Sequence, residues 1–268
     1  MIQNRSQPAK TPLPDGEIHL WITRPEQHQC ATLLERFDRV MTEEERERQQ
    51  RYRFEKDRHS ALVTRAFVRD LLSRYADRQP EEWRFAKGER DKPEIIDPPI
   101  PLCFNLSHTH GLICCAVTLH NDIGCDVEYI DRNNDILNIA DRYFSPEETR
   151  ELFSLPAAEQ RSRFFDYWTL KESYIKAWGL GLAIPLEDFT FHIGGSENAV
   201  ENRKIRLSFA PKRIDYPDLW QSWLFYPCAT HRMALSIRRK AGEMRKEFPV
   251  RFFESTPLVE YREVSLPS

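Results

Sequence analysis

The stretch that decides the fold is Ile123-Gly124-Cys125-Asp126-Val127-Glu128, in which apolar residues alternate with glycine or an acid. Successive side chains of a β-strand point to opposite faces, so this alternation predicts a strand whose apolar face covers a core. Asp126 and Glu128 then project side by side from the other face. Gly124 lies beside them on that face, and we expect it to leave room for a ligand. The alternative is an ordinary solvated strand.

The segments on either side of this strand predict two similar halves. Before it, we expect a strand, two helices, a long helix and two strands, at 18–22, 30–40, from 42, 60–75, 102–106 and 112–119. After it, we expect three helices and four strands, at 133–143, 146–153, 159–178, 188–193, 204–209, 221–226 and 231–238. The strands at 102–106, 112–119 and 123–129 are so close in sequence that an antiparallel meander is expected.

This order predicts an α+β fold of two pseudosymmetric halves, each a small antiparallel sheet packed with a long helix, with the active site in the cleft between them. Residues 1–121 would form the N-terminal half and residues 122–240 the C-terminal half. The tail at 241–268 carries no motif that assigns it a role.

A second acidic block lies in the long helix, in Trp168-Thr169-Leu170-Lys171-Glu172-Ser173-Tyr174-Ile175-Lys176. Glu172 and Lys176 are four residues apart and share nearly one face, at the edge of the apolar arc. Together with Asp126 and Glu128, Glu172 gives three oxygen ligands, the type that Mg²⁺ prefers together with substrate phosphates and water. This set indicates phosphoryl-type chemistry, whereas an ordinary surface pair is the alternative for Glu172 and Lys176.

Other features narrow the chemistry. Phe104-Asn105-Leu106-Ser107-His108 ends a strand and opens a turn, where Ser107 and His108 either contact a phosphate or serve the turn itself. Lys171 falls inside the apolar arc of its helix and is expected to pair structurally. There is no G-x-S-x-G elbow and no Walker A loop, and Gly179-Leu180-Gly181 follows a helix instead of opening one.

Composition limits the class of protein. The chain has 268 residues, 40% of them hydrophobic, and a net charge of −3, so it is globular and has no overall field that favours nucleic acid. The six cysteines include no C-x-x-C pair, which favours reduced, mostly buried thiols. The amino terminus lacks an apolar signal core and no run reaches membrane-spanning length. We therefore expect a cytoplasmic protein that does not associate with membranes.

The order of the three motifs, Phe104 to His108, Gly124 to Glu128 and Trp168 to Leu182, resembles the 4′-phosphopantetheinyl transferases, and most closely their larger, monomeric type that activates secondary-metabolite synthases. The resemblance is strong over 92–191 and looser over 42–75. It implies an enzyme that transfers the phosphopantetheine arm of coenzyme A to a serine of an apo acyl- or peptidyl-carrier protein and releases adenosine 3′,5′-bisphosphate. It also implies Mg²⁺, with Mn²⁺ as an alternative, and coenzyme A as co-substrate.

The resemblance implies a role for each matching residue. Asp126, Glu128 and Glu172 would hold the metal against the pyrophosphate, and Glu172, directly or through a metal-bound water, would also take the serine proton. Lys176 would offset charge on the leaving phosphate. The remaining coenzyme A contacts would come from the pyrophosphate ligands Ser107 and His108, from Lys92 in a Lys-Pro loop, and from the 3′-phosphate ligands Arg48 and Lys87. Glu45 stands where relatives can carry a lysine, so the 3′-phosphate site is expected to differ in detail.

Two other functions fit a carboxylate Mg²⁺ site. One is a phosphodiesterase acting on a coenzyme A-like or carrier-bound phosphopantetheine, and the other is a non-catalytic protein that binds coenzyme A or a carrier. Because net charge cannot attract an acidic carrier, we expect a local docking patch over 143–163, with Arg142, Arg150, Arg161, Arg163, Phe144, Leu152 and Phe153.

Overall fold

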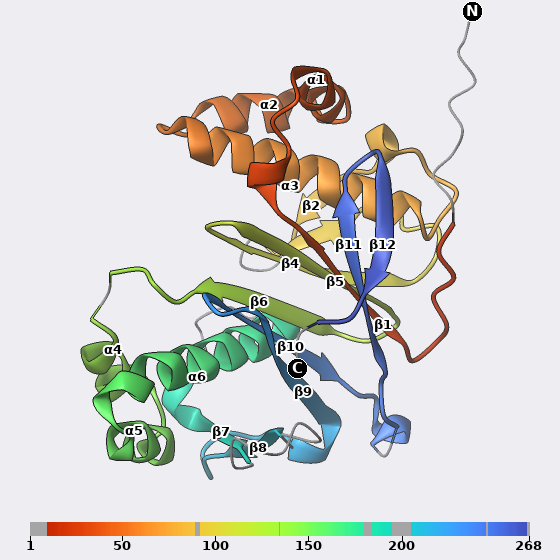
Figure 1. The fold of residues 1–268 in the computed structure, drawn as a ribbon. Coiled ribbons are helices and arrows are strands. Elements are labelled where there is room, and N and C mark those ends of the chain that lie inside the picture. Colours follow the sequence, from red (N-terminus) through yellow and green to blue (C-terminus); the bar gives the residue numbers. More distant parts are fainter. Residues whose placement is uncertain are drawn as a thin grey trace, which may run out of the picture.

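The computed structural model describes residues 10–88, 92–133, 135–179, 184–194, 205–244 and 246–266. Two sheets pack face to face, and a helical layer covers the outer side of each (Figure 1). This gives the layer order helix, sheet, sheet, helix, with the N-terminal elements above and most C-terminal elements below (Figure 1). Each sheet therefore buries both faces of its central strands, and the described residues form three hydrophobic clusters.

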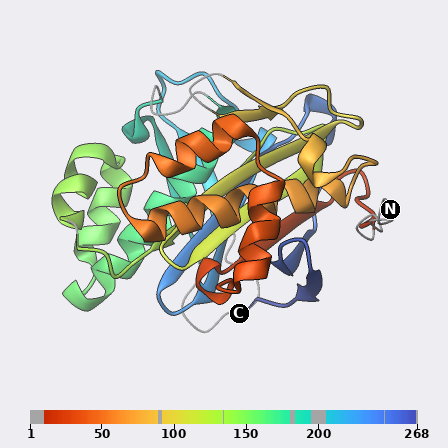
Figure 2. The ribbon, with the colours of Figure 1, turned by 90° about the horizontal axis from the view of Figure 1, so that it is seen from above.

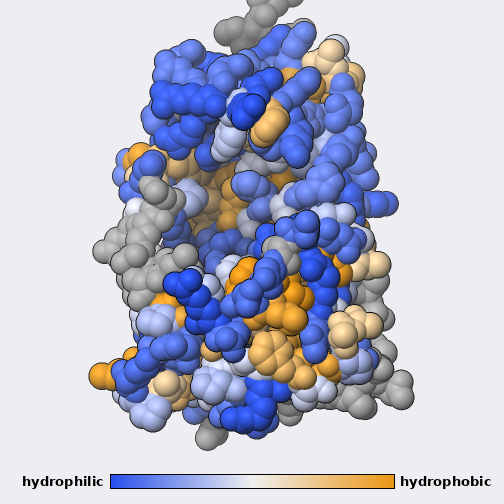
Figure 3. Space-filling view, turned by 90° about the vertical axis from the view of Figure 1, so that its left-hand side faces the viewer, coloured by the Kyte–Doolittle hydropathy of each residue, from blue (hydrophilic) through white to orange (hydrophobic). Residues whose placement is uncertain are grey.

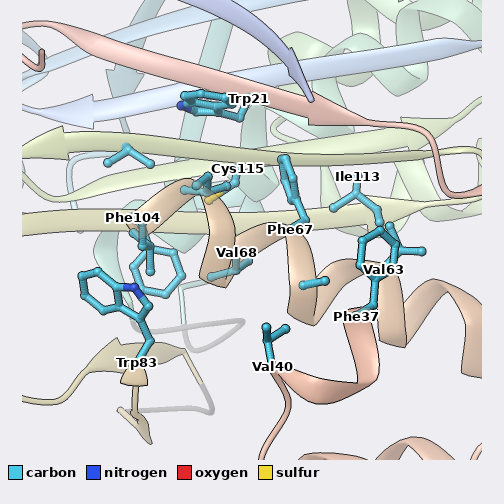
Figure 4. Packing of buried hydrophobic residues seen from close by; sticks show 14 of the residues in the cluster. Trp21, Phe37, Val40, Val63, Phe67, Val68, Trp83, Phe104, Ile113 and Cys115 are labelled. Atoms are coloured by element: carbon cyan, nitrogen blue, oxygen red, sulfur yellow. The ribbon is translucent and has the colours of Figure 1, made fainter. Parts of the chain in front are cut away.

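The first half begins with β1 (Ile18–Thr23) and the helices α1 (Ala31–Arg39), α2 (Glu43–Gln50) and α3 (Glu55–Ser73). The hairpin β2 (Phe85–Lys87) and β3 (Pro93–Ile95) follows, and then β4 (Leu102–Thr109) and β5 (Leu112–Leu119). Figure 2 shows the helices lying across the strands of their sheet. In Figure 4, Phe67 and Val63 of α3 point toward Cys115 and Ile113 of β5, which forms the upper core.

The second half repeats this order. It contains β6 (Ile123–Tyr129), α4 (Ile136–Tyr143), α5 (Pro146–Ser154), α6 (Ala157–Trp178), the hairpin β7 (Phe189–Ile193) and β8 (Ile205–Phe209), and then β9 (Trp220–Cys228) and β10 (His231–Arg238). The strand order β1-β5-β4 of the first sheet matches β6-β10-β9 of the second, and both sets are antiparallel. The predicted α+β fold of two pseudosymmetric halves is therefore confirmed.

Local sequence explains where several helices begin and end. The Thr42 hydroxyl and the Glu45 carboxylate form a reciprocal capping box at the start of α2, and Ser145 and Glu148 do the same for α5. Gly179 adopts φ 73° after the last residue of α6, a left-handed conformation that glycine accepts without steric cost. The helical boundaries predicted near 42, 146 and 178 are confirmed.

The expected meander is wrong at its third strand. β4 and β5 pair as predicted, but β6 pairs with β10 and belongs to the second sheet. The reason is burial: Ile123, Cys125 and Val127 of β6 pack face to face against the first sheet, on residues that include Cys114 and Ala116 of β5. This stacking removes apolar side chains from water on both strands, which edge-to-edge pairing would not do.

The carboxyl-terminal tail completes the first sheet. β11 (Val250–Thr256) pairs with β1 in parallel, and β12 (Glu260–Val264) pairs with β11. Phe253 and Tyr261 join the upper core beside Trp21. The tail thus returns from the lower half to cover an edge of β1 that would otherwise lack a partner (Figure 1).

All six cysteines are free thiols, and Cys114, Cys115 and Cys125 are buried. Cys114 and Cys115 face opposite clusters, as expected for adjacent strand residues.

Candidate active site

The site forms where β6 crosses α6. A Cβ atom on Gly124 would lie 2.1 Å from the carbonyl oxygen of Ser173 and 2.3 Å from the backbone nitrogen of Ala177. Gly124 therefore permits the close approach of the two backbones. The expectation that Gly124 leaves room for a ligand is wrong, because α6 occupies that space. The close approach places the acids of β6 opposite Lys176 of α6.

Asp126, Lys176 and Ser107 form a tight polar cluster. The Lys176 ammonium donates to Asp126 Oδ1 at 2.6 Å and to Ser107 Oγ at 2.9 Å, and the Ser107 hydroxyl donates to Asp126 Oδ1 at 2.9 Å. Ser107 Oγ also accepts from the backbone N–H of Val127 at 3.3 Å. The Ser107 hydroxyl thus donates its one proton and accepts hydrogen bonds at both of its lone pairs. The other oxygen of Asp126, Oδ2, is buried and has no hydrogen-bond partner among the described residues.

The ionised forms of the Glu128 and Glu172 carboxylates are destabilised in the site. Burial, followed by repulsion from Asp126, raises the pKa of each to about 7. Glu128 is partly compensated, because it accepts a hydrogen bond from Trp168 Nε1 at 2.9 Å and pairs with Arg132 at 2.7 Å. Burial lowers the pKa of Lys176, but the attraction of Asp126 outweighs it and leaves the pKa above its ordinary value. The site therefore gathers more negative charge than its own cation neutralises.

These residues suit a divalent cation, although the described residues contain no group of three acids, histidines or cysteines already closed around one point. The unpartnered Asp126 Oδ2 is a vacant oxygen ligand, and Glu128 and Glu172 would both return to their ordinary ionisation beside a cation. The Arg132 side chain, which pairs with Glu128, is 40% exposed and also lies over the ring of the buried Phe165. The donor set is all oxygen, which matches a hard cation such as Mg²⁺.

Two pockets adjoin the cluster. Lys92 Nζ donates to the carbonyl of Lys176 at 2.9 Å and lines a pocket of 360 Å³ together with Trp178 and Gly179. Toward the other end of β4, His108 lines a pocket of 740 Å³ with residues of α3 that include Arg65. Burial, followed by repulsion from Lys176, lowers the pKa of His108. Figure 3 shows that this side of the molecule is hollowed between its upper and lower parts.

The structure brings together most of the predicted site residues, namely Ser107, His108, Asp126, Glu128, Glu172 and Lys176, with Lys92 at their border. Arg48 and Lys87 do not line either of these two pockets. Arg48 lies on α2, half exposed, and pairs with Glu44 at 3.1 Å, and Lys87 ends β2. Both remain predictions.

Glu45, where relatives can carry a lysine, has a structural role here. It caps α2 and pairs with the buried Arg69 at 2.7 Å. Lys171 is likewise structural, as predicted: it pairs with Glu148 at 2.7 Å, and neither side chain is exposed. Sequence reasoning missed Trp168 and Arg132 as partners of Glu128. Glu128 and Arg132 are four residues apart, but this spacing predicts an ion pair only on a helix, and Glu128 lies on a predicted strand.

Comparison with known proteins identifies the family. Residues 122–234 match the 4′-phosphopantetheinyl transferase superfamily model, and residues 22–120 match the model of the 4′-phosphopantetheinyl transferase N-terminal region. The 4′-phosphopantetheinyl transferase HetI of Nostoc sp. is 34% identical over 72% of this chain and 81% of its own length. The 4′-phosphopantetheinyl transferase Sfp of Bacillus subtilis is 35% identical over 74% of this chain and 85% of its own.

The fold and the site thus define a class of enzyme, and this chain belongs to the 4′-phosphopantetheinyl transferase superfamily. Within it, the chain is of the larger, Sfp-like type, since both its halves match and it covers most of the length of these relatives. Within the described ranges, no helix combines the length and the apolar character needed to cross a membrane.

Proposed function

We propose that this enzyme transfers the 4′-phosphopantetheine arm of coenzyme A to the serine hydroxyl of an apo acyl- or peptidyl-carrier protein and releases adenosine 3′,5′-bisphosphate. The observation that carries the proposal is the convergence of Asp126, Glu172 and Lys176 beside Ser107, between two pockets and at the junction of the halves. A metal-binding carboxylate set next to a lysine fits reaction at a pyrophosphate, because both the transferred and the leaving groups carry negative charge.

The side chains have separable tasks. Glu172 suits a general base: its pKa is raised to about 7 without a cation, and beside a bound cation its carboxylate would be ionised and able to accept the serine proton. Lys176 stays cationic and is positioned by Asp126 and Ser107 to neutralise charge on the departing phosphate. Asp126, Glu128 and Glu172 would hold a divalent cation, which would supply charge neutralisation to the pyrophosphate oxygens. The pyrophosphate contacts are proposed for Ser107 and His108.

The remaining assignments follow the sequence. We assign residues 1–121 to the adenosine side of coenzyme A, with Lys92 beside the phosphates and Arg48 and Lys87 at the 3′-phosphate. We assign residues 122–240 to the metal and the catalytic helix. A monomer working in the cytoplasm, without nucleic acid as a partner, completes the proposal.

A direct experiment tests this function. The enzyme is mixed with an apo-carrier, coenzyme A and Mg²⁺, and the carrier is weighed by mass spectrometry. A gain of one phosphopantetheine supports transfer, loss of the arm from a holo-carrier supports the phosphodiesterase, and no change supports binding alone. Asp126→Ala should abolish the gain while circular dichroism stays unchanged, and unchanged carrier modification would refute the metal assignment.

The structure changes the expected docking patch over 143–163. Phe144 and Leu152 are buried in the hydrophobic cluster that α4, α5 and α6 form with the second sheet, so they are not surface residues. The exposed apolar side chains here are Leu137, Tyr143 and Phe153.

Arginines on these helices also differ in availability. Arg161 donates to the carbonyls of Ile130 and Arg132, and Arg163 pairs with Glu151 at 3.4 Å, whereas Arg142 and Arg150 are exposed. We propose that an acidic carrier docks on a patch made of these exposed residues, namely Leu137, Tyr143, Phe153, Arg142 and Arg150. Added salt and the Arg150→Glu variant should each raise the KM for the carrier more than that for coenzyme A. A carrier KM that responds to neither would place docking elsewhere.

A further inference from the structure

The strand that carries Asp126 and Glu128 has one edge without a strand partner in the described ranges. β6 is the outermost strand of its sheet, in the order β6-β10-β9, so one row of its backbone N–H groups points away from β10. Cys125 and Val127 are buried, and a buried N–H without an acceptor is costly. The acceptors must therefore come from outside the second sheet.

Side chains of β4 supply these acceptors. The hydrogen bonds run from the N–H groups of Cys125, Val127 and Tyr129 to side-chain oxygens of Asn105, Ser107 and Thr109, at 2.9, 3.3 and 3.3 Å respectively. The spacing is two residues on both strands, so every second residue of β4 serves every second residue of β6. We call this set the side-chain ladder. It replaces a backbone ladder and joins the first half of the molecule to the second.

Asn105 makes the shortest bond of the side-chain ladder and is only 4% exposed. It also fixes Cys125 a second time, because its backbone carbonyl accepts from the Cys125 thiol at 3.1 Å. Asn105 and Ser107 thus hold the residues immediately before and after Asp126. Ser107 already belongs to the polar cluster with Lys176, whereas, outside the pairing of β4 with β5, the hydrogen bonds of Asn105 within the described part of the chain go to Cys125.

We propose that Asn105 is a positioning residue: by accepting the Cys125 N–H, it fixes the place of Asp126 relative to Ser107 and Lys176 across the junction of the two halves. This inference rests on the proposed function, since it concerns the same carboxylate site. Loss of the bond frees β6 to shift along the first sheet. Asp126 then presents its oxygens in the wrong place for a cation, although the core of each half persists.

A matched pair of variants isolates the hydrogen bond. Asn105→Thr replaces the amide oxygen by a hydroxyl acceptor, the group that Ser107 and Thr109 already provide on the same strand. The valine of Asn105→Val has the shape of threonine but no acceptor. The first readout is the affinity for Mn²⁺ in the presence of coenzyme A, measured by electron paramagnetic resonance on the full chain. The second is carrier modification, separated into kcat and KM, and the third is the melting temperature.

We expect Asn105→Val to bind Mn²⁺ about tenfold more weakly than Asn105→Thr, because the free-energy cost of an unsatisfied buried N–H corresponds to a factor of about ten or more in an equilibrium constant. The kcat should fall with it, and the KM for coenzyme A should change less. A purely structural role would lower the melting temperature of Asn105→Val and leave the Mn²⁺ affinity of the folded protein equal to that of Asn105→Thr. That outcome overturns the inference.

The outcomes also separate this inference from the proposed function. If wild-type enzyme modifies a carrier but the two variants bind Mn²⁺ equally, only the positioning role is refuted. If wild-type enzyme modifies no carrier, the proposed function fails, and the Mn²⁺ comparison still decides whether Asn105 positions a cation site. Should Asn105→Val not fold, Asn105→Ala removes the same acceptor without apolar bulk, and the same difference from Asn105→Thr is expected.

Discussion

Glu172→Gln should make the metal-free enzyme more stable at pH 8 while abolishing transfer. Burial and the nearby Asp126 raise the pKa of Glu172 from 4.5 to about 7. Each pKa unit corresponds to about 1.36 kcal/mol, so ionising this side chain in the folded state costs up to about 3 kcal/mol. Because the acids of the site are coupled, we expect a gain of about 1–3 kcal/mol from the neutral glutamine.

The sign of the pH dependence follows from linkage. The pKa of Glu172 is higher in the folded protein than in the unfolded chain, so the folded protein holds an extra proton between pH 4.5 and about 7. The contribution of Glu172 is therefore most favourable below pH 4.5 and is lost as the pH rises through about 7. The advantage of Glu172→Gln should be absent near pH 4.5 and fully developed at pH 8.

The assay is the melting temperature of both proteins from pH 4.5 to 8, with a chelator present. For a domain of this size, about 1–3 kcal/mol raises the melting temperature by about 2–10 °C. Glu47→Gln, which removes an exposed carboxylate from α2, is the matched control and should show no such pH-dependent gain. Parallel curves for wild type and Glu172→Gln across this range would refute the electrostatic reasoning.

Three further outcomes follow from the contacts. Gly124→Ala should displace α6 and cost about 1–3 kcal/mol in urea unfolding, since its Cβ would lie 2.1 Å from the Ser173 carbonyl oxygen, and an unchanged midpoint would contradict this. Lys171→Met should cost about 3–5 kcal/mol by leaving the Glu148 charge buried without its cation, and adding Glu148→Gln should restore part of it, because the amide oxygen can still accept a hydrogen bond from the Ser145 or Phe191 N–H group. Arg48→Ala should weaken the binding of coenzyme A by about 1.5–3 kcal/mol and so raise its KM, whereas the KM for 3′-dephospho-coenzyme A should change much less. Equal increases of the two KM values would show that Arg48 does not contact the 3′-phosphate.

The sequence by itself determined the elements and the faces they bury. The alternation over 123–128 shows which side of β6 is apolar, and the capping residues Thr42, Ser145 and Gly179 set helix ends, because such signals act over a few residues. Glu172 and Lys176 could be paired on one helical face for the same reason. The order of the motifs gave the family, which the comparisons confirm.

Only the tertiary structure decided which segments meet. The tail pairs with β1 across more than half of the chain, and β6 stacks on the first sheet instead of extending it. Gly124 serves a helix crossing, and Asn105 serves a strand of the other half. Segments that are far apart in sequence pair in this way because together they bury apolar area and satisfy backbone hydrogen bonds. The residues next to each segment in the sequence do not indicate which distant segment it will contact.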